Sequence, residues 1–299
     1  MSSDLLLPGV IRGAELVVAV ATTTEVCRAA QAVHELAPTS SVALGRLISA
    51  ASLSSLLVQK PGITSLQIVC SGRLGQAFAE VTHRGAIRGY VKNPRLDLPL
   101  IAPPDQEPRR SIALGIGDGL LAVTREAVDT HFTQSTVPLI SGEIDLDVEH
   151  FCVTSDQIPT ALACDVLLDD DGAVALAGGL IVQAMPGADL DRLRQLRAQL
   201  IDGELARLLD HHAGDAADML RALVPEVVAV ARPLELEWRC RCSYQRVLDA
   251  LALLSPDELG QMAEMGEAAS INCDFCRKSY EVSAFELLRL YHSAGKAEG

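Results

Sequence analysis

The 299-residue chain is long enough for one large domain and a small one, because domains usually contain about 100–200 residues. Hydrophobic residues make up 49% of the chain and charged residues 21%, a globular balance that argues against overall disorder. The formal net charge of −14 argues against nonspecific binding to nucleic acid or to an anionic membrane surface.

The first ten residues show no secretory signal, because they lack a basic segment followed by an apolar run. The longest apolar stretch, Val42 to Val58, is interrupted by Arg46 and several serines, which suits a buried helix better than a membrane span. We therefore expect a cytoplasmic protein without a membrane segment. In that reducing compartment, clustered cysteines more often bind metal or sense redox state than form structural disulfides.

Residues 1–185 have the pattern of a mixed α/β domain. Helices are predicted over Thr24–Leu36, from its helical period, and over the nearly continuous apolar stretch Ser41–Lys60. The Asp-Asp-Asp-Gly run at 169–172 predicts a turn between two strands. Apolar stretches bounded by glycine or polar residues predict strands at Glu15–Thr22, Leu66–Cys70, Ala86–Val91, Leu120–Thr124, Ala161–Leu168 and Gly179–Ala184.

Residues 186–237 have the sequence pattern of a helical linker. From Asp189 to Leu209, leucine and isoleucine recur at a helical period with charged residues between them. Gly203 interrupts this pattern, and Gly214 and Pro225 punctuate the stretch that follows. Helices broken in this way are marginal on their own and need tertiary packing to persist. We therefore expect the linker to be metastable.

Residues 238–299 form a compact module with clear helix signals. Ser255 and Glu258 make a capping box with proline at the first helical position, and Ser283 and Glu286 make a second box before the apolar helix Phe285–Tyr291. Residues 271–282 between them predict a turn or short hairpin. The predicted fold class is α+β, with a large mixed α/β N-terminal domain (1–185), a helical linker (186–237) and a small C-terminal zinc-binding domain (238–299).

The eight cysteines fall into two groups. Cys27, Cys70, Cys152 and Cys164 are scattered singly, and core packing is the favoured interpretation for them. The other four form two close pairs, which can converge as four thiolates around one Zn²⁺ ion in the tetrahedral arrangement of closed structural sites. These four predicted zinc ligands are Cys240, Cys242, Cys273 and Cys276.

The Cys-x-Cys half of this pattern favours a reversible switch. Residues two apart can form a disulfide only near the edge of allowed geometry, and a strained disulfide is easier to reduce. Oxidation would remove the ligands and withdraw the folding energy that zinc supplies, about 10 kcal/mol or more, which exceeds the usual net stability of a small domain. The basic residues beside the ligands either favour thiolates or are simply solvated, and the sequence leaves both interpretations open.

These residues resemble the 33 kDa heat-shock chaperone family, the redox-regulated bacterial holdases. The most specific part of the resemblance is Cys240-Arg241-Cys242-Ser243 with Arg246, then Gly266-Glu267, then Cys273-Asp274-Phe275-Cys276 with Tyr280. Weaker matches in the same order extend over nearly the whole chain, among them Ala43-Leu44-Gly45-Arg46, Arg88-Gly89-Tyr90-Val91 and Gly142-Glu143.

The resemblance implies a chaperone that is inactive when reduced and zinc-bound, and active when oxidised and zinc-free. It implies disulfides Cys240–Cys242 and Cys273–Cys276 in the active form, and a linker that loses its order. It also implies binding of unfolded client proteins without ATP, commonly by a homodimer. The four additional cysteines depart from the family pattern and allow off-pathway oxidation.

Two other functions compete with this one. A zinc-ribbon nucleic-acid module is disfavoured because residues 238–299 carry nine acidic and seven basic residues and no basic face with stacking aromatics. A thiol-disulfide oxidoreductase using Cys273 and Cys276 would place them at the start of a helix after a strand, a context not visible here. Gly115–Gly119 predicts a turn, and no Gly-Lys-Ser/Thr loop is present, so we expect neither ATP use nor enzyme activity.

Overall fold

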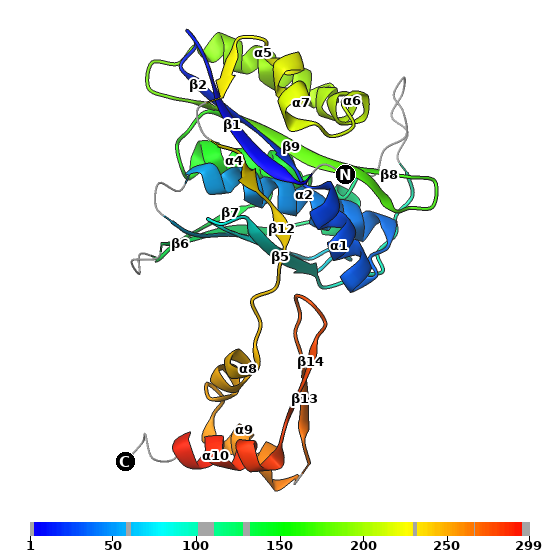
Figure 1. Ribbon diagram of the computed structural model, residues 1–299, viewed down its shortest axis with the longest axis vertical. Coiled ribbons are helices and arrows are strands. Elements are labelled where there is room, and N and C mark those ends of the chain that lie inside the picture. Colours follow the sequence, from blue (N-terminus) through cyan, green and yellow to red (C-terminus); the bar gives the residue numbers. More distant parts are fainter. Residues whose placement is uncertain are drawn as a thin grey trace. The chain divides into compact units, whose positions relative to one another are not determined.

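The computed structural model describes residues 3–57, 61–100, 111–127, 132–229, 232–265 and 267–294. The chain divides into two compact units, Met1–Arg239 and Cys240–Gly299 (Figure 1). The prediction of a helix over Ser41–Lys60 partly concerns residues 58–60, which lie outside the described residues, as does Gly266 of the cysteine-rich motif. Among the described residues, none of the helices is both long and apolar enough to cross a membrane.

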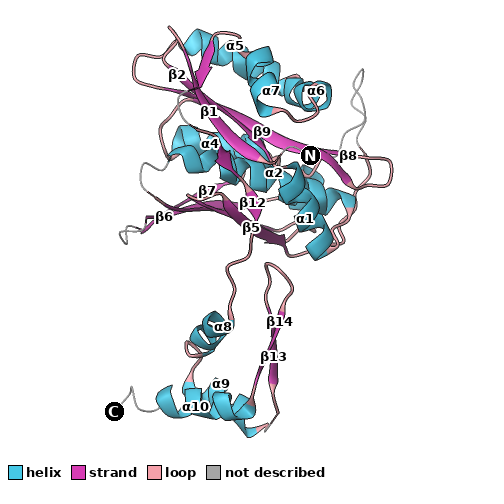
Figure 2. Cartoon of the chain, viewed as in Figure 1, coloured by secondary structure: helices cyan, strands magenta, loops and turns pink. Residues whose placement is uncertain are grey.

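The first unit contains two six-stranded sheets (Figure 2). The first sheet has the order β10-β1-β2-β9-β8, with β11 also paired to β1. Its strands are β1 (Leu5–Ile11), β2 (Leu16–Thr22), β8 (Thr160–Leu168), β9 (Val174–Ala184), β10 (Val227–Ala229) and β11 (Leu234–Glu235). The turn predicted at 169–172 joins β8 to β9, with the Gly172 N–H donating to the Asp169 carbonyl.

The second sheet has the order β12-β5-β4-β3-β6-β7. Within the described residues of this sheet, β12 runs parallel to its neighbour, β5, and the other neighbouring strands are antiparallel. The strands are β3 (Gly62–Cys70), β4 (Gln76–Thr82), β5 (Ala86–Val91), β6 (Gly119–Ala127), β7 (Phe132–Pro138) and β12 (Glu237–Trp238). Arg239, directly after β12, still donates its backbone N–H to the Ile87 carbonyl and is the last residue of the first unit.

Helices fill the space between the two sheets. They are α1 (Thr24–His34), α2 (Pro38–Ser54) with the short 3₁₀ turn η1 (Ser55–Leu57), α3 (Ala113–Ile116) and α4 (Ile144–Thr154). Nearly every residue of α2 is buried, which explains its continuous apolar sequence. The main core joins α1, α2 and α4 to the inner faces of both sheets. The predicted turn at 115–119 is in fact the end of α3 and the left-handed Gly117 that leads into β6.

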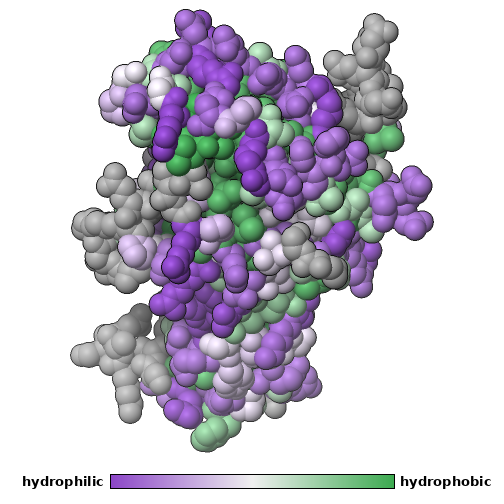
Figure 3. All heavy atoms as spheres, turned by 45° about the horizontal axis from the view of Figure 1, so that its top comes forward, coloured by the Kyte–Doolittle hydropathy of each residue, from purple (hydrophilic) through white to green (hydrophobic). Residues whose placement is uncertain are grey.

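The outer face of the first sheet is covered by the helices of residues 186–237. These are α5 (Leu190–Ile201), α6 (Glu204–His211) and α7 (Ala216–Leu223). Alternation along β2 places Leu16, Val18 and Val20 on this face, while Ala19 and Ala21 join the core on the opposite face. The outer surface over the three helices is mainly hydrophilic (top of Figure 3). The predicted break at Gly203 is confirmed, since α5 ends before it and α6 begins after it.

The second unit contains α8 (Tyr244–Leu251), α9 (Pro256–Glu264), the hairpin β13 (Ala269–Asn272) and β14 (Ser279–Val282), and α10 (Ala284–Ala294). Both predicted capping boxes are present: Ser255 with Glu258, and Ser283 with Glu286. The predicted hairpin is confirmed as well. The buried core is small, with Leu251, Ala263, Val282 and Leu287 as its main cluster.

Candidate metal site

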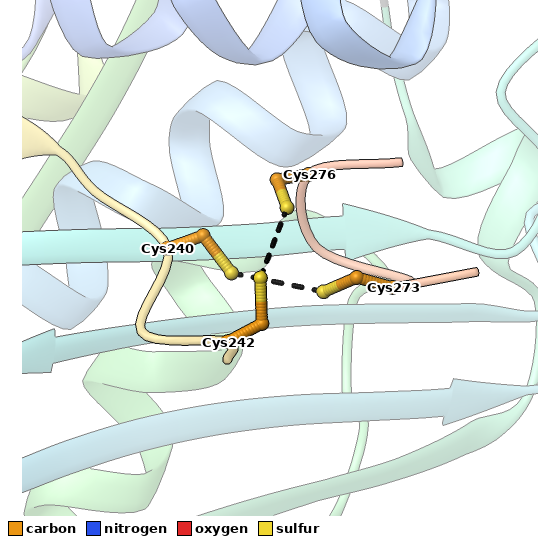
Figure 4. A group of neighbouring side chains, drawn as sticks. All are labelled: Cys240, Cys242, Cys273 and Cys276. Atoms are coloured by element: carbon orange, nitrogen blue, oxygen red, sulfur yellow. Dashed lines mark hydrogen bonds between the residues drawn. The ribbon is translucent and has the colours of Figure 1, made fainter. Parts of the chain in front are cut away.

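Four cysteines of the second unit come together from two short segments. Cys240 and Cys242 lie in the extended segment before α8, and Cys273 and Cys276 lie in the turn between β13 and β14. All four side chains point toward one centre (Figure 4). The spacing in the sequence predicted this group, although its role as a ligand set stays a prediction.

The distances between the sulfur atoms suit a tetrahedral ligand set. The four Sγ atoms all lie within 4.8 Å of one another. Cys240 Sγ is 3.7 Å from Cys273 Sγ, and Cys242 Sγ is 3.4 Å from Cys276 Sγ. A Zn–S bond of about 2.3 Å in a tetrahedron requires sulfur atoms about 3.8 Å apart. The group can therefore hold a metal ion, and its all-sulfur donor set is the one preferred by zinc in closed structural sites.

The turn that carries Cys273 and Cys276 is held by its own backbone. The Cys273 N–H donates to the Lys278 carbonyl at 2.9 Å, and the Arg277 N–H donates to the Cys273 carbonyl at 2.8 Å. Arg277 has a φ of 59°, a left-handed conformation that turns the chain back into β14. On the other segment, the Ser243 hydroxyl accepts the Arg246 N–H and caps α8 directly after Cys242.

The thiols of Cys240, Cys242 and Cys276 differ in pKa. Burial raises the pKa of Cys242, but hydrogen bonds from the Tyr280 hydroxyl and the neighbouring thiols outweigh it and lower the pKa to about 7. Burial, with the Cys242 thiol nearby, raises the pKa of Cys276 to about 12, and burial also raises that of Cys240. The hydrogen bonds from the Tyr280 hydroxyl and the neighbouring thiols therefore favour the thiolate form of Cys242 over those of Cys240 and Cys276.

Three of the basic residues near the cluster have contacts outside the thiol group. Arg239 pairs with Glu237, and Arg246 donates to the Arg241 carbonyl at 3.0 Å. The Lys278 ammonium lies 5.0 Å from the centre of the Tyr280 ring. Hydrogen bonds, more than neighbouring cations, lower the Cys242 pKa. For Arg239, Arg246 and Lys278, these contacts do not favour the interpretation in which the basic residues favour thiolates.

The four remaining cysteines belong to the core, as predicted. Cys27, Cys152 and Cys164 are buried in the main cluster, and Cys70 packs against it half-buried. Burial raises the pKa of Cys27 and Cys152 to about 12 and that of Cys164 far above its usual range. Their thiols are therefore neutral and poorly reactive at neutral pH.

The site also bears on the oxidoreductase alternative. Cys273 and Cys276 lie in a hairpin turn, not at the start of a helix that follows a strand. They share their site with a second cysteine pair, so that both are surrounded by sulfur. A thioredoxin-like context for this pair is therefore absent from the part of the chain that the structure describes.

The fold and the cysteine site define a two-unit protein with a four-thiol, metal-type site in its small C-terminal unit. Residues 4–283 match the family described as Hsp33 protein. The chain is 34% identical over 301 aligned residues to a 33 kDa chaperonin of Thermus thermophilus, covering 95% of this chain and 86% of the relative. It is 30% identical over 278 residues to a 33 kDa chaperonin of Geobacillus kaustophilus, covering 92% and 93%.

A solved structure is also similar over its full length. The 33 kDa chaperonin (heat shock protein 33 homolog) of Thermotoga maritima superposes with a TM-score of 0.80 at 28% identity, covering 100% of both chains. The chain therefore belongs to the Hsp33 family, which is a family of chaperones and not of enzymes. This confirms the family, the α+β fold class and the chaperone function expected from the sequence.

Proposed function

We propose that the protein is a redox-regulated holdase that binds unfolding client proteins in the cytoplasm under oxidative stress, without ATP. The observation that carries this proposal is the convergence of four cysteine sulfur atoms, all within 4.8 Å, from two separate segments of one small unit. With a metal bound, such a site cross-links the two segments. Without the metal, its four thiols can be oxidised to two disulfides.

In the reduced state we propose that Cys240, Cys242, Cys273 and Cys276 hold one Zn²⁺ ion. Zinc would supply most of the folding free energy of the second unit, about 10 kcal/mol or more. That contribution matters because, among the described residues, the main apolar cluster of this unit contains four buried residues. The reduced form is the inactive one.

Oxidation removes the ligands. In each disulfide, two thiolates give two electrons to one molecule of hydrogen peroxide, which takes up two protons and leaves as two molecules of water. We propose the neighbour pairs Cys240–Cys242 and Cys273–Cys276. Cross pairs would close loops of 33 or 34 residues, whereas neighbours stay close even after the unit unfolds. The second unit then loses its metal and its fold.

The linker helices can supply the client surface. Their buried residues pack on the outer face of the first sheet, so that lifting the layer exposes apolar surface on both sides; the helix residues are Leu193, Leu196, Leu200, Leu205, Leu208, Leu209, Met219, Leu220 and Leu223. The layer is divided into short helices at Gly203 and Gly214, which are both in a left-handed conformation, and short helices depend on packing to persist. A cavity of about 180 Å³ also lies beside Gly203, between Leu200, Leu205 and the Arg46 side chain.

The polypeptide connection between the linker and the second unit can couple unfolding of that unit to release of the linker helices. The linker ends in the short strands β11 and β12, and Cys240 follows Trp238 after a single residue. This end of the linker is held in the first unit by the two-residue pairing of β12 with β5 and by the Arg239 N–H bond to the Ile87 carbonyl. We propose that unfolding of the adjoining second unit frays this short pairing. We propose that the three helices then leave the sheet, and that the active form is a homodimer. Neither nucleic acid nor a membrane is a proposed partner.

The proposal is tested with the full-length, zinc-loaded protein and a heat-unfolding client enzyme. We expect light scattering to show no protection by the reduced protein and strong protection after treatment with peroxide and mild warming, with no ATP present. Cys70→Ser, which removes a thiol outside the cluster, should behave like the wild type. Equal protection by both forms, or none after complete oxidation, would refute the redox switch.

A further inference from the structure

Helix α5 of the linker packs on β8 and β9, on the outer face of the first sheet. Its buried side chains are Leu193, Leu196 and Leu200. Their spacing of three and four residues places them on one side of the helix, in a single apolar stripe. The same apolar cluster contains these residues of β8 and β9: Ala161, Ala163, Leu180 and Val182.

A basic side chain of α5 also pairs with the first unit outside the linker. Arg197 Nε donates to Glu149 Oε1 of α4 over 2.6 Å. The Glu149 side chain is 9% exposed, and its Oε2 accepts the Leu162 N–H of β8 over 3.0 Å. Because β8 is the outermost strand of its sheet, this carboxylate is fixed at the border of the apolar face.

Arg197 differs from a neighbouring arginine of the same helix. Arg194 pairs with Asp191, which also belongs to α5, and its side chain is 73% exposed. Arg197 instead follows Leu196 directly and lies beside the apolar stripe. Helix α5 thus presents leucines to the sheet and one arginine to α4.

Further negative charge lies along the same edge strand. Glu143, Asp145 and Asp165 surround the Arg46 guanidinium, so that three carboxylates face one cation. They line the cavity of about 180 Å³ beside Gly203, at the junction of α5 and α6. An acidic border of this kind attracts positively charged groups and repels negatively charged ones.

We propose that, once the linker has left, the face occupied by α5 binds client segments in which a lysine or arginine lies beside an apolar stripe. Glu149 is the residue that selects the positive charge. The inference rests on the proposed release of the linker. In the reduced form, α5 occupies the face as an intramolecular substitute for such a segment. Departure of α5 uncovers the apolar surface and frees the Glu149 carboxylate together. A segment with an acidic residue at the position of Arg197 is disfavoured, because it would meet the acidic border.

The test uses fluorescein-labelled synthetic peptides of residues 189–203 with the full-length protein, either reduced or completely oxidised with peroxide under mild warming. One peptide has the natural sequence, the second carries Arg197→Gln and the third carries Arg194→Gln. The two substituted peptides have the same net charge, so Arg194→Gln is the matched control. Fluorescence anisotropy measures the affinity of each peptide.

Two variants of the protein complete the design. Glu149→Gln removes the negative charge but keeps a side-chain oxygen that can accept the Leu162 N–H. Glu35→Gln is its control, because Glu35 is an exposed carboxylate that follows α1 and pairs with Arg95.

We expect the natural peptide to bind the oxidised wild type and not the reduced form. Arg197→Gln should weaken peptide binding about three- to thirtyfold, between the effects of losing an exposed and a buried ion pair, whereas Arg194→Gln should change it little. The Glu149→Gln protein should bind the natural and Arg197→Gln peptides equally. The Glu35→Gln protein should keep the wild-type preference.

Equal affinities of the Arg197→Gln and Arg194→Gln peptides for the oxidised wild type would overturn the inference. An undiminished preference in the Glu149→Gln protein would overturn it as well. Binding of none of the peptides after complete oxidation would instead overturn the proposed release of the linker, and this inference with it. Failure of the proposed function is thus distinguishable from failure of the proposed selectivity.

Discussion

The sulfur atoms of the cluster are in contact across its two segments. Cys242 lies 3.4 Å from Cys276, and Cys240 lies 3.7 Å from Cys273. No segment can therefore form the site alone, and removing one sulfur should leave three thiols that hold a metal poorly. The four predicted ligands should act as a single set.

Cys276→Ser should weaken zinc binding by well over tenfold, because even the loss of a partner outside the ligand set commonly costs about 10–100-fold in metal affinity. Competition with a coloured chelator in reduced protein measures this affinity. Cys70→Ser is the matched control, since Cys70 is a half-buried thiol outside the cluster. Equal zinc affinity in the two variants would show that Cys276 is not a ligand.

A second residue-scale effect concerns Asp4, which is 4% exposed and accepts the Val26 N–H at 2.7 Å. Burial raises its pKa to about 6 despite this hydrogen bond. A raised carboxyl pKa means that the folded state holds the proton more tightly than the unfolded state. The contribution of Asp4 to stability is therefore full below about pH 4 and is lost as the pH rises toward 6.

Asp4→Asn should remove this pH dependence. Between pH 4 and 6 the wild type should lose up to about 1.4 kcal/mol of unfolding free energy per pH unit relative to the variant. Urea unfolding of the two proteins at several pH values measures the difference. Parallel stability curves would show that Asp4 titrates normally in the folded protein.

At the scale of elements, the layer formed by α5, α6 and α7 matters most. Leu196 on α5 is fully buried against the first sheet, whereas Ile201 at the end of the same helix is 51% exposed. Leu196→Ala should destabilise the layer by about 2–5 kcal/mol, because it leaves a cavity in a packed core. Ile201→Ala is the matched control and should change the stability of the layer little.

Amide hydrogen exchange of the reduced protein tests this prediction. In Leu196→Ala, amides of α5 to α7 should exchange faster, while those of α2 should keep wild-type protection. Uniformly faster exchange throughout the first unit would contradict the idea of a separately released linker. So would identical exchange in the two variants.

The elements that the sequence predicted are those whose burial follows a simple pattern. A fully buried α2 and the valine-rich β2 need apolar residues and show them. By contrast, β1 contains Pro8 and Gly9, which ordinarily argue against a strand, and β7 is a mainly polar, exposed strand that pairs with β6 at the edge of its sheet. Both owe their structure to pairing with a partner strand, which no local period reveals.

The site follows the same rule. The spacing of the cysteines was enough to predict which four residues converge, because the residue type itself identifies a possible metal ligand. The contact between Tyr280 and Cys242 depends on the register of the β13–β14 hairpin, so the sequence marked Tyr280 only through its resemblance to a family. Its position four residues after Cys276, on the inward side of a strand, was the available signal.

For the whole molecule, the two units should differ in their dependence on metal. The first has two large apolar clusters, and the second a small one. Treating reduced protein with a strong chelator should unfold residues 240–299, while the core between the two sheets remains folded. Limited proteolysis followed by mass spectrometry should show early cleavage in the second unit. A chelated protein that resists cleavage there would show that this unit folds without metal.

The central claim is that opening of the cysteine cluster turns the chaperone on. The most direct measurement follows zinc release and suppression of client aggregation in the same sample, from reduced protein through treatment with peroxide and mild warming. The account predicts that protection rises in parallel with the fraction of zinc-free protein. Zinc release without any protection, or full protection while zinc stays bound, would contradict it.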